Sequence, residues 1–140
     1  MQLKYLTAND MALLRTISRR QTFKPREIII AINSRPNAMF LLISGVAAVE
    51  VMRGSPIAKL TAGDICGEMA FIENNAASAS VVAETETEVY VLDLIKISET
   101  FVHHPHLEAR FYKSLALLLS QRLRSTSGQL SKASSPELTR

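Results

Sequence analysis

The chain has very little cysteine, and this scarcity limits the kinds of site it can hold. Cys66 is the single cysteine, so it cannot form an intramolecular disulfide or share a structural zinc with a second thiolate. A lone cysteine most often behaves as a small buried hydrophobic side chain, and the neighbouring Glu68 would not favour its thiolate. We therefore expect Cys66 to be structural, with oxidant sensing as the alternative.

Long hydrophobic runs are also absent. No apolar stretch reaches the roughly 18 residues that a membrane span needs, and the opening residues MQLKYLTAND lack the apolar segment of a secretory signal. The 140 residues are 47% hydrophobic and 21% charged, which suits one globular core. We expect no membrane span, a cytoplasmic location, and either a whole protein or a soluble domain of a larger one.

Familiar catalytic and metal-binding patterns are missing as well. The sequence has no Gly-x-Ser-x-Gly motif, no Ser-His-Asp arrangement and no glycine-rich P-loop, so an enzyme is not expected. His103, His104 and His106 surround Pro105, but no carboxylate or thiol stands at a clear ligand spacing beside them. Exposed imidazoles at a helix junction are the favoured interpretation, and we predict no metal or cofactor.

Charge is unevenly distributed along the chain. Residues 1–35 carry seven Lys and Arg against two acids, residues 36–100 three against nine, and residues 101–140 six against two. The middle of the chain is therefore acidic and both ends are basic. This pattern does not resemble one basic face that follows a nucleic-acid backbone, so the net charge of +3 does not predict DNA binding.

The order of predicted elements places many short strands between helical ends. Thr7 and Asp10 have the spacing of a capping box, which predicts a helix over residues 7–20. Further helices are predicted over 94–102 and, after Pro105, over 106–125, with a single helical turn over 67–72. Runs of β-forming residues bounded by turn residues predict strands over 27–32, 38–44, 46–52, 57–60, 78–83 and 88–92.

This pattern favours a mainly β fold with flanking helices, a double-stranded β-helix or jelly roll, which commonly encloses a small ligand. The predicted domain covers residues 1–125. Residues 126–140 are rich in Ser, Thr and Lys, and we expect a flexible tail there.

One stretch carries a specific resemblance. Gly63–Phe71, followed by Ala76–Ala83, resembles the phosphate-binding cassette of cyclic-nucleotide-binding domains, the family of the catabolite activator and of the protein kinase A regulatory subunit. The resemblance extends over about residues 6–125 and includes Phe23–Pro25 and the strand end Leu42–Gly45. It implies a regulatory domain that binds cyclic AMP or cyclic GMP.

The resemblance also implies roles for individual residues. Gly67 would let the backbone approach the ligand, Glu68 would accept a hydrogen bond from the ribose 2′-hydroxyl, and Met69 and Ala70 would offer backbone N–H groups. Such amides form an anion site of the helix N-terminus or nest type. Ser78, with Ala77 and Ala79 beside it, would line the phosphate position.

The sequence departs from the family at the residue that pairs with the phosphate. Ala77 stands where the family has an arginine, and no Lys or Arg occurs between Lys59 and Lys96. A charge-assisted hydrogen bond contributes roughly 1.5 to 3 kcal/mol, so its loss should weaken binding roughly 10- to 150-fold. Two outcomes stay open: weak binding of a cyclic nucleotide, or a cavity that is empty or takes an uncharged or hydrophobic ligand.

The long predicted helix at the end of the chain suggests a partner. Its apolar residues Leu107, Phe111 and Leu115 recur on one face, while Leu119 and Leu123 widen the apolar surface. In catabolite-activator relatives this helix forms a homodimer interface, and a structural interaction module is therefore the alternative function. Only about fifteen residues follow it, so this chain alone is not expected to read DNA.

Overall fold

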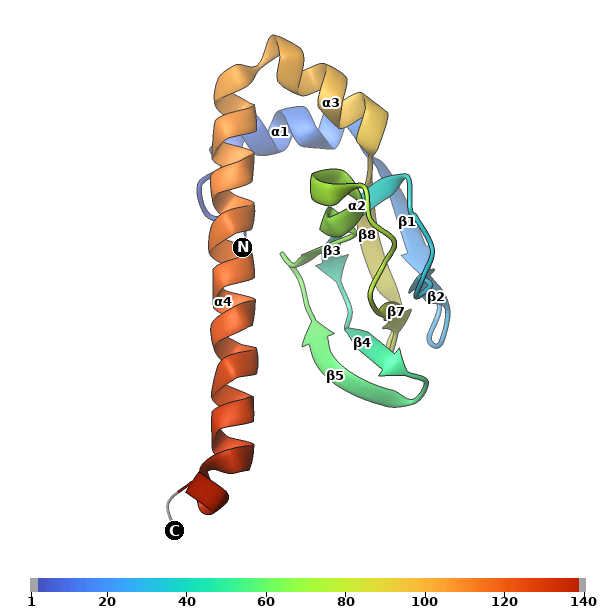
Figure 1. Cartoon of the computed structure of the whole chain (residues 1–140). Coiled ribbons are helices and arrows are strands. Elements are labelled where there is room, and N and C mark those ends of the chain that lie inside the picture. The colour runs from blue at the N-terminus through green and yellow to red at the C-terminus, as the bar shows by residue number, and fades with distance from the viewer. Residues whose placement is uncertain (1–2, 139–140) are drawn as a thin grey trace.

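Two antiparallel four-stranded sheets face each other in the computed structural model, and helices cover one side of the roll that they form (Figure 1). The structure describes the backbone of residues 3–138 and the side chains of residues 3–125. One sheet has the order β1 (Arg19–Phe23), β8 (Thr87–Asp93), β3 (Ala38–Ser44) and β6 (Ile65–Cys66). The other has the order β2 (Ile28–Ile30), β7 (Ser80–Ala83), β4 (Ala47–Met52) and β5 (Ser55–Leu60).

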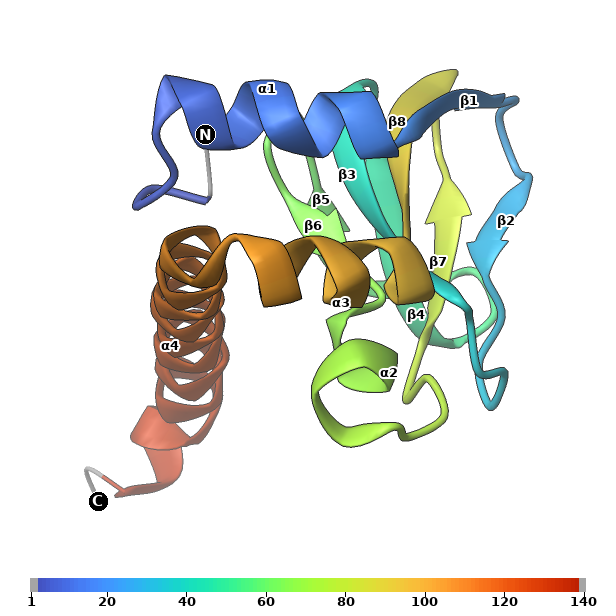
Figure 2. The same cartoon turned by 90° about the horizontal axis from the view of Figure 1, so that it is seen from above.

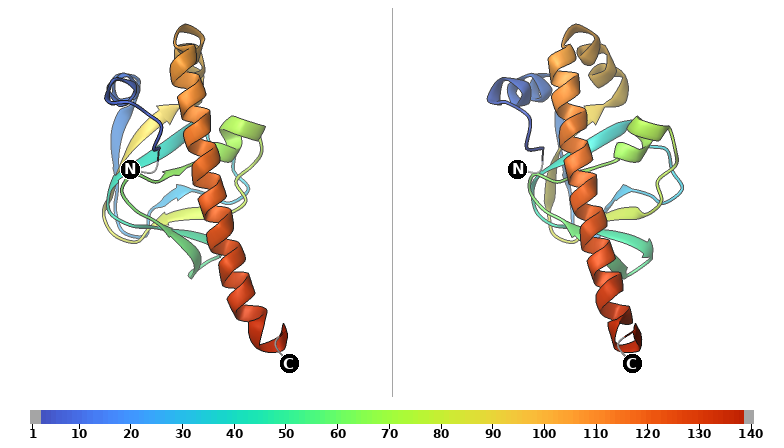
Figure 3. Two further views of the ribbon diagram at one scale, coloured as in Figure 1. Left: turned by 90° about the vertical axis from the view of Figure 1, so that its left-hand side faces the viewer. Right: turned by 60° about the vertical axis from the view of Figure 1, so that its left-hand side comes forward.

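Four helices complete the described part of the chain: α1 (Ala8–Ile17), α2 (Glu68–Glu73), α3 (Leu94–His103) and α4 (Pro105–Leu138). Seen from above, α1 and α3 cross the same end of the roll, and α4 is viewed nearly along its axis beside them (Figure 2). Helix α4 then passes along the roll, and its C-terminal end extends beyond the sheets (Figure 3). No helix in the described residues has both the length and the apolar character needed to cross a membrane.

Strands β3 and β8 serve two hydrophobic cores because successive side chains of a strand point to opposite faces. Met39 and Leu41 of β3 and Leu92 of β8 pack in the core that the sheet shares with α1, α3 and α4. Leu42 of β3 and Val89 of β8 face the other core, between the two sheets. The sheet therefore holds the helices and the inner surface of the roll in fixed relation.

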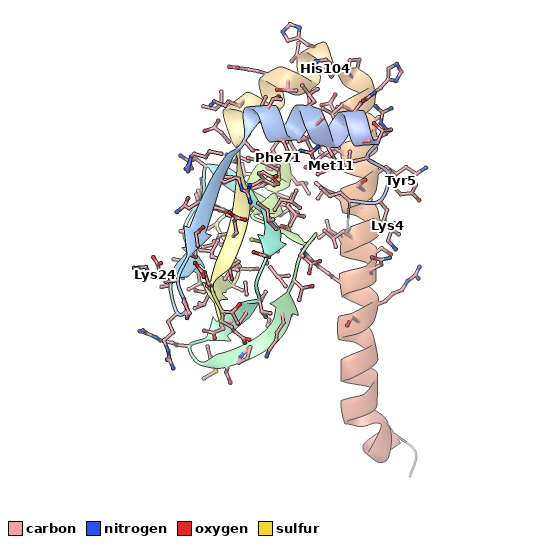
Figure 4. All side chains as sticks on the ribbon, turned by 180° about the vertical axis from the view of Figure 1, so that it is seen from behind. Lys4, Tyr5, Met11, Lys24, Phe71 and His104 are labelled. Atoms are coloured by element: carbon pink, nitrogen blue, oxygen red, sulfur yellow. The ribbon has the colours of Figure 1, made fainter. Side chains whose placement is uncertain are left out.

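The N-terminal half of α4 is fastened to the start of the chain. Arg110 donates two hydrogen bonds to the Asp10 carboxylate, at 2.6 and 2.8 Å. The Tyr5 amide donates to Ser114 Oγ at 3.0 Å, and Figure 4 shows Tyr5 beside α4. The Arg110 guanidinium, with a smaller contribution from Thr7, lowers the pKa of Asp10 to about 2. This end of α4 is thus held by a buried carboxylate.

Most predicted elements are present, although the strands expected over 27–32 and 78–83 are shorter, at Ile28–Ile30 and Ser80–Ala83. Three further differences are larger. The capping box of Thr7 and Asp10 is confirmed, but the helix ends at Ile17, and its predicted continuation to Arg20 is wrong. Residues 19–23 instead pair as an edge strand with β8, and tertiary pairing overrides their local preference. The two-residue strand β6 also lies where only a turn and the residues after it were expected.

The third difference concerns α4. The prediction that this helix ends at Ser125 is wrong, because its backbone continues to Leu138. Residues 126–135 contain one glycine and no proline, so no residue there blocks the helical hydrogen bonds. The side chains beyond Ser125 lie outside the described residues, and the domain boundary at 125 and the flexible tail over 126–140 stay predictions.

Candidate functional site

A cavity of about 760 Å³ opens between the β-roll and α4. Residues Gly67–Ala70 and Ala77–Ala79 all line it, so the fold brings together every residue that the sequence singled out for ligand binding. The volume lies in the range of roughly 300 to 1,000 Å³ that is typical of small-molecule sites. The first segment is the N-cap residue and first turn of α2, and the second is the loop that leads into β7.

Gly67 occupies a position that requires glycine. Its φ of 88° is in the left-handed region, and it is the N-cap residue of α2, without a side-chain hydrogen bond. A Cβ at this position would lie 2.9 Å from the Ala38 carbonyl oxygen and 3.3 Å from Met39 Cα. The backbone at Gly67 can therefore pass close to β3 immediately before Glu68, which lines the cavity.

Glu68 is a buried carboxylate with one paired and one unpaired oxygen. Only 7% of the residue is exposed. Arg122 of α4 donates to Glu68 Oε1 at 2.9 Å and also to the Ile65 carbonyl oxygen at 2.5 Å. Glu68 Oε2 is buried and has no hydrogen-bond partner among the described residues. An unpaired buried acceptor is costly, so this oxygen is suited to a hydrogen-bond donor on a ligand.

The segment at the expected phosphate position is held by backbone hydrogen bonds. The Ala77 amide donates to the Ser34 carbonyl oxygen at 2.7 Å, and the Ala77 carbonyl accepts from the Asn33 amide at 2.8 Å. Ser78 Oγ lies 3.4 Å from Met69 Sδ, as a weak donor to sulfur. The amide of Ala77 is thus already used within the protein, and its methyl side chain offers no donor.

The described residues that line the cavity include two cations and two acids. Lys59 and Arg122 are the cations among its described lining residues, and both contact carboxylates. Lys59 lies 3.2 Å from Glu84, and its side chain is largely exposed. Asp64 and Glu68 supply negative charge at the same cavity. The segment Ala77–Ala79 therefore brings no cation of its own to an anionic group in the cavity.

Two other candidate groups can be placed. Cys66 is buried, as predicted, and burial raises the pKa of its thiol, with further raising by the Glu68 and Asp64 charges. His104 lies at the corner between α3 and α4, at the end of the molecule away from the roll (Figure 4). No group of three or more potential metal ligands occurs among the described residues.

Phe71 connects the cassette to the C-terminal helices. Its ring centroid lies 6.1 Å from that of Phe101 on α3, 6.1 Å from that of Phe111 on α4 and 5.7 Å from that of Tyr112 on α4. Together with the Glu68–Arg122 pair, this cluster gives α2 two separate contacts with the helices that cover the roll.

Arg122 is the cavity residue that the sequence analysis did not single out as part of the site. It lies 54 residues from Glu68 in the sequence, and no local spacing connects the two. The predicted helix over 106–125 carries four cations, Arg110, Lys113, Arg122 and Arg124, so the sequence does not show which of them pairs with Glu68.

The comparison with family models identifies the fold. The cyclic nucleotide-binding domain model matches residues 20–104, which is more than half of the chain. The protein therefore belongs to the cyclic nucleotide-binding domain family, and both the predicted family and the predicted β-roll with flanking helices are confirmed.

Curated relatives match most of this chain over a small part of their own length. The chain is 32% identical over 121 residues to Glutaminase 1 of Bradyrhizobium diazoefficiens, covering 86% of this chain and 20% of that protein. It is 28% identical over 123 residues to Cyclic GMP-binding protein C of Dictyostelium discoideum, covering 85% of this chain and 5% of that protein. The chain thus spans a fifth or less of these curated relatives.

Solved structures resemble the whole described fold. A cyclic nucleotide-binding domain from Methylobacillus flagellatus superimposes with a TM-score of 0.83 at 22% identity, over 91% of this chain and 74% of that one. The Thermus thermophilus catabolite activator protein superimposes with a TM-score of 0.76 at 24% identity, over 96% of this chain and 63% of that one. At these identities the likeness establishes the fold.

Proposed function

We propose that this domain is a non-enzymatic regulatory module in which a ligand in the roll cavity alters the contacts of α4, and that its affinity for cyclic AMP and cyclic GMP is weak or lost. The observation that carries the proposal is the ion pair between Glu68 of the cassette and Arg122 of α4. The residue expected to touch a ligand is also a residue that holds the helix.

The coupling follows from what a ligand would change. A ligand hydroxyl that reaches Glu68 enters the hydrogen-bonding environment that Arg122 now uses, so ligand and helix affect one carboxylate. Arg110 and Arg122 are twelve residues apart on α4, which corresponds to about 18 Å along the axis. A change at Arg122 would therefore act on the part of α4 beyond its fixed N-terminal half. A ligand that binds more tightly when the Glu68–Arg122 pair is broken than when it is formed, or the reverse, would shift the populations of these two arrangements.

The weak affinity follows from Ala77. The family resemblance assigns the phosphate contact to this position, where the side chain is a methyl group and the amide already donates to Ser34. Losing one charge-assisted hydrogen bond to the phosphate costs roughly 1.5 to 3 kcal/mol, or roughly 10- to 150-fold in affinity. The backbone amides at the start of α2 and the Ser78 hydroxyl would be left to receive the charge.

Calorimetric titration with cyclic AMP and cyclic GMP tests the proposal. We expect binding that is weak or undetectable for the natural chain and at least tenfold tighter for Ala77→Arg. The Glu68→Ala change, made in the Ala77→Arg background, should abolish the gained binding. Thermal melting of each variant controls for loss of the fold. Tight binding by the natural chain, or no gain in Ala77→Arg with its fold intact, would contradict the proposal.

An interaction module without a small-molecule ligand is the second candidate, favoured by the exposed apolar residues of α4. Leu123 is 67% exposed and Leu119 is 36% exposed, and both lie at the cavity. A second copy packed on this face would cover them, since exposed apolar patches often mark association sites. Sedimentation analysis distinguishes the candidates: a dimer that Leu123→Glu converts to a monomer, with no nucleotide response, would favour this second function.

A further inference from the structure

The cavity combines a buried hydrogen-bond acceptor with a neutral, largely apolar surface. Glu68 Oε2 is buried and has no partner among the described residues, so it accepts a hydroxyl or amino group. The cavity lining also includes the apolar residues Val49, Val81 and Leu118, which can contact a flat or apolar group. A ligand that fits this lining combines a hydrogen-bond donor with an apolar part.

The charged residues that line the cavity give a negatively charged ligand no net attraction. Both cations among its described lining residues contact carboxylates, and Asp64 and Glu68 contribute two acids. The lining segment Ala77–Ala79 itself supplies no cationic side chain, and the Ala77 amide donates within the protein. A phosphate would lose its hydration there without a full charge partner. The same desolvation costs an uncharged group much less free energy.

We infer that the site takes an uncharged, hydroxylated ligand of the nucleoside class in preference to a cyclic nucleotide. This inference rests on the proposed function, since it names the ligand of the same cavity. A nucleoside carries a ribose hydroxyl for Glu68 Oε2 and a planar base for the apolar wall, and it omits the charge that the Ala77 region cannot pair. Its free 5′-hydroxyl can donate or accept near Ser78, where a phosphate would require a cation.

The test compares adenosine, 2′-deoxyadenosine and cyclic AMP by calorimetric titration of the natural chain. Adenosine and cyclic AMP share the base and the 2′-hydroxyl, so the difference between them reports the phosphate. We expect adenosine to bind at least tenfold more tightly than cyclic AMP. Removing the 2′-hydroxyl should weaken binding roughly 10- to 150-fold, because it removes a donor to a buried carboxylate.

Two variants place the effect at the correct residue. Ala77→Arg should raise the affinity for cyclic AMP at least tenfold and change the affinity for adenosine by less than about threefold, so that the preference for adenosine is reduced or reversed. Ala76→Arg adds the same charge to the neighbouring residue, which is outside the cavity lining, and should change neither affinity. Equal effects of the two substitutions would show a general effect of charge and would overturn the assignment to Ala77.

The outcomes separate this inference from the proposed function. If cyclic AMP binds the natural chain as tightly as adenosine or more tightly, the nucleoside preference is wrong, and the regulatory proposal still stands if α4 responds. If adenosine binds but amide exchange along α4 does not change, the ligand class stands and the coupling fails. If neither compound binds at millimolar concentration, the nucleoside inference is overturned, and the interaction module becomes the favoured function.

Discussion

Replacing Arg122 by methionine should destabilise the protein more than replacing its partner Glu68 by glutamine. The two side chains form one hydrogen-bonded pair at 2.9 Å, but they differ in burial: 9% of the Glu68 side chain and 31% of the Arg122 side chain are exposed. Methionine keeps much of the aliphatic length of arginine and leaves the carboxylate buried with neither oxygen paired. Glutamine keeps the shape of glutamate and leaves a guanidinium that water can still reach.

The magnitudes follow from that asymmetry. An unsatisfied buried acceptor costs about 1 to 3 kcal/mol, and a charged one lies at the upper end, so we expect about 2 to 3 kcal/mol for Arg122→Met. Solvent screens the group left in Glu68→Gln, for which we expect about 1 kcal/mol. The double variant should cost less than the sum, with a coupling energy of about 1 to 2 kcal/mol.

Urea unfolding of the natural chain, both single variants and the double variant gives these values at neutral pH. The change Arg124→Met serves as the matched control, since Arg124 is an exposed arginine on the same helix. Equal costs for Arg122→Met and Glu68→Gln, or a coupling energy near zero, would refute the view that this pair fastens α4 to the cassette.

Three further predictions concern other parts of the structure. Because Arg110 lowers the pKa of Asp10 from 3.8 to about 2, the pair stabilises the fold above pH 4 and loses this effect as pH falls toward 2. Because Arg110 is partly exposed, we expect the free energy of unfolding to fall by on the order of 1 to 2 kcal/mol over this pH range through this pair, as measured by unfolding at a series of pH values. This loss should be absent in Asp10→Asn, and an acid profile unchanged in that variant would contradict the prediction. Gly67→Ala should cost about 2 kcal/mol or more in thermal unfolding, and clearly more than Gly54→Ala, because both glycines have positive φ but no atom lies within 4 Å of a Cβ at Gly54. Similar losses at the two glycines would show that the contact with β3 is unimportant. The buried Cys66 thiol should react with iodoacetamide at neutral pH only after urea unfolds the chain, and rapid reaction of the native protein would mean that the roll opens readily.

Local patterns were sufficient to predict most of the fold. The Thr7–Asp10 capping box placed the start of α1, and the run 38–44 gave the bounds of β3 without error, since both depend on residues close in the sequence. Strand β1 was missed because Arg19–Phe23 has little β character of its own and is a strand through its pairing with β8. The end of α4 was missed because a polar composition was taken for an end of the helix.

The sequence predicted the cassette residues of the candidate site but not the residue that α4 contributes. A family resemblance marked residues 67–70 and 77–79, and the fold gathers them around one cavity. The other half, Arg122 on α4, depends on how a helix packs over a roll 54 residues away, which no spacing in the sequence records. The free oxygen of Glu68 likewise follows from burial, and burial is known only once the fold is known.

Hydrogen–deuterium exchange along α4 tests the central claim most directly, that ligand in the cavity and the position of α4 depend on each other. The exchange of amides in residues 67–71 and 105–125 would be measured with and without saturating adenosine, and with cyclic AMP for Ala77→Arg, with Arg122→Met as the uncoupled control. We predict that ligand changes exchange both in residues 67–71 and around residue 122, and that in Arg122→Met the change persists in residues 67–71 and is absent around residue 122. Altered exchange in the cassette alone, with α4 unaffected by bound ligand, would contradict the account.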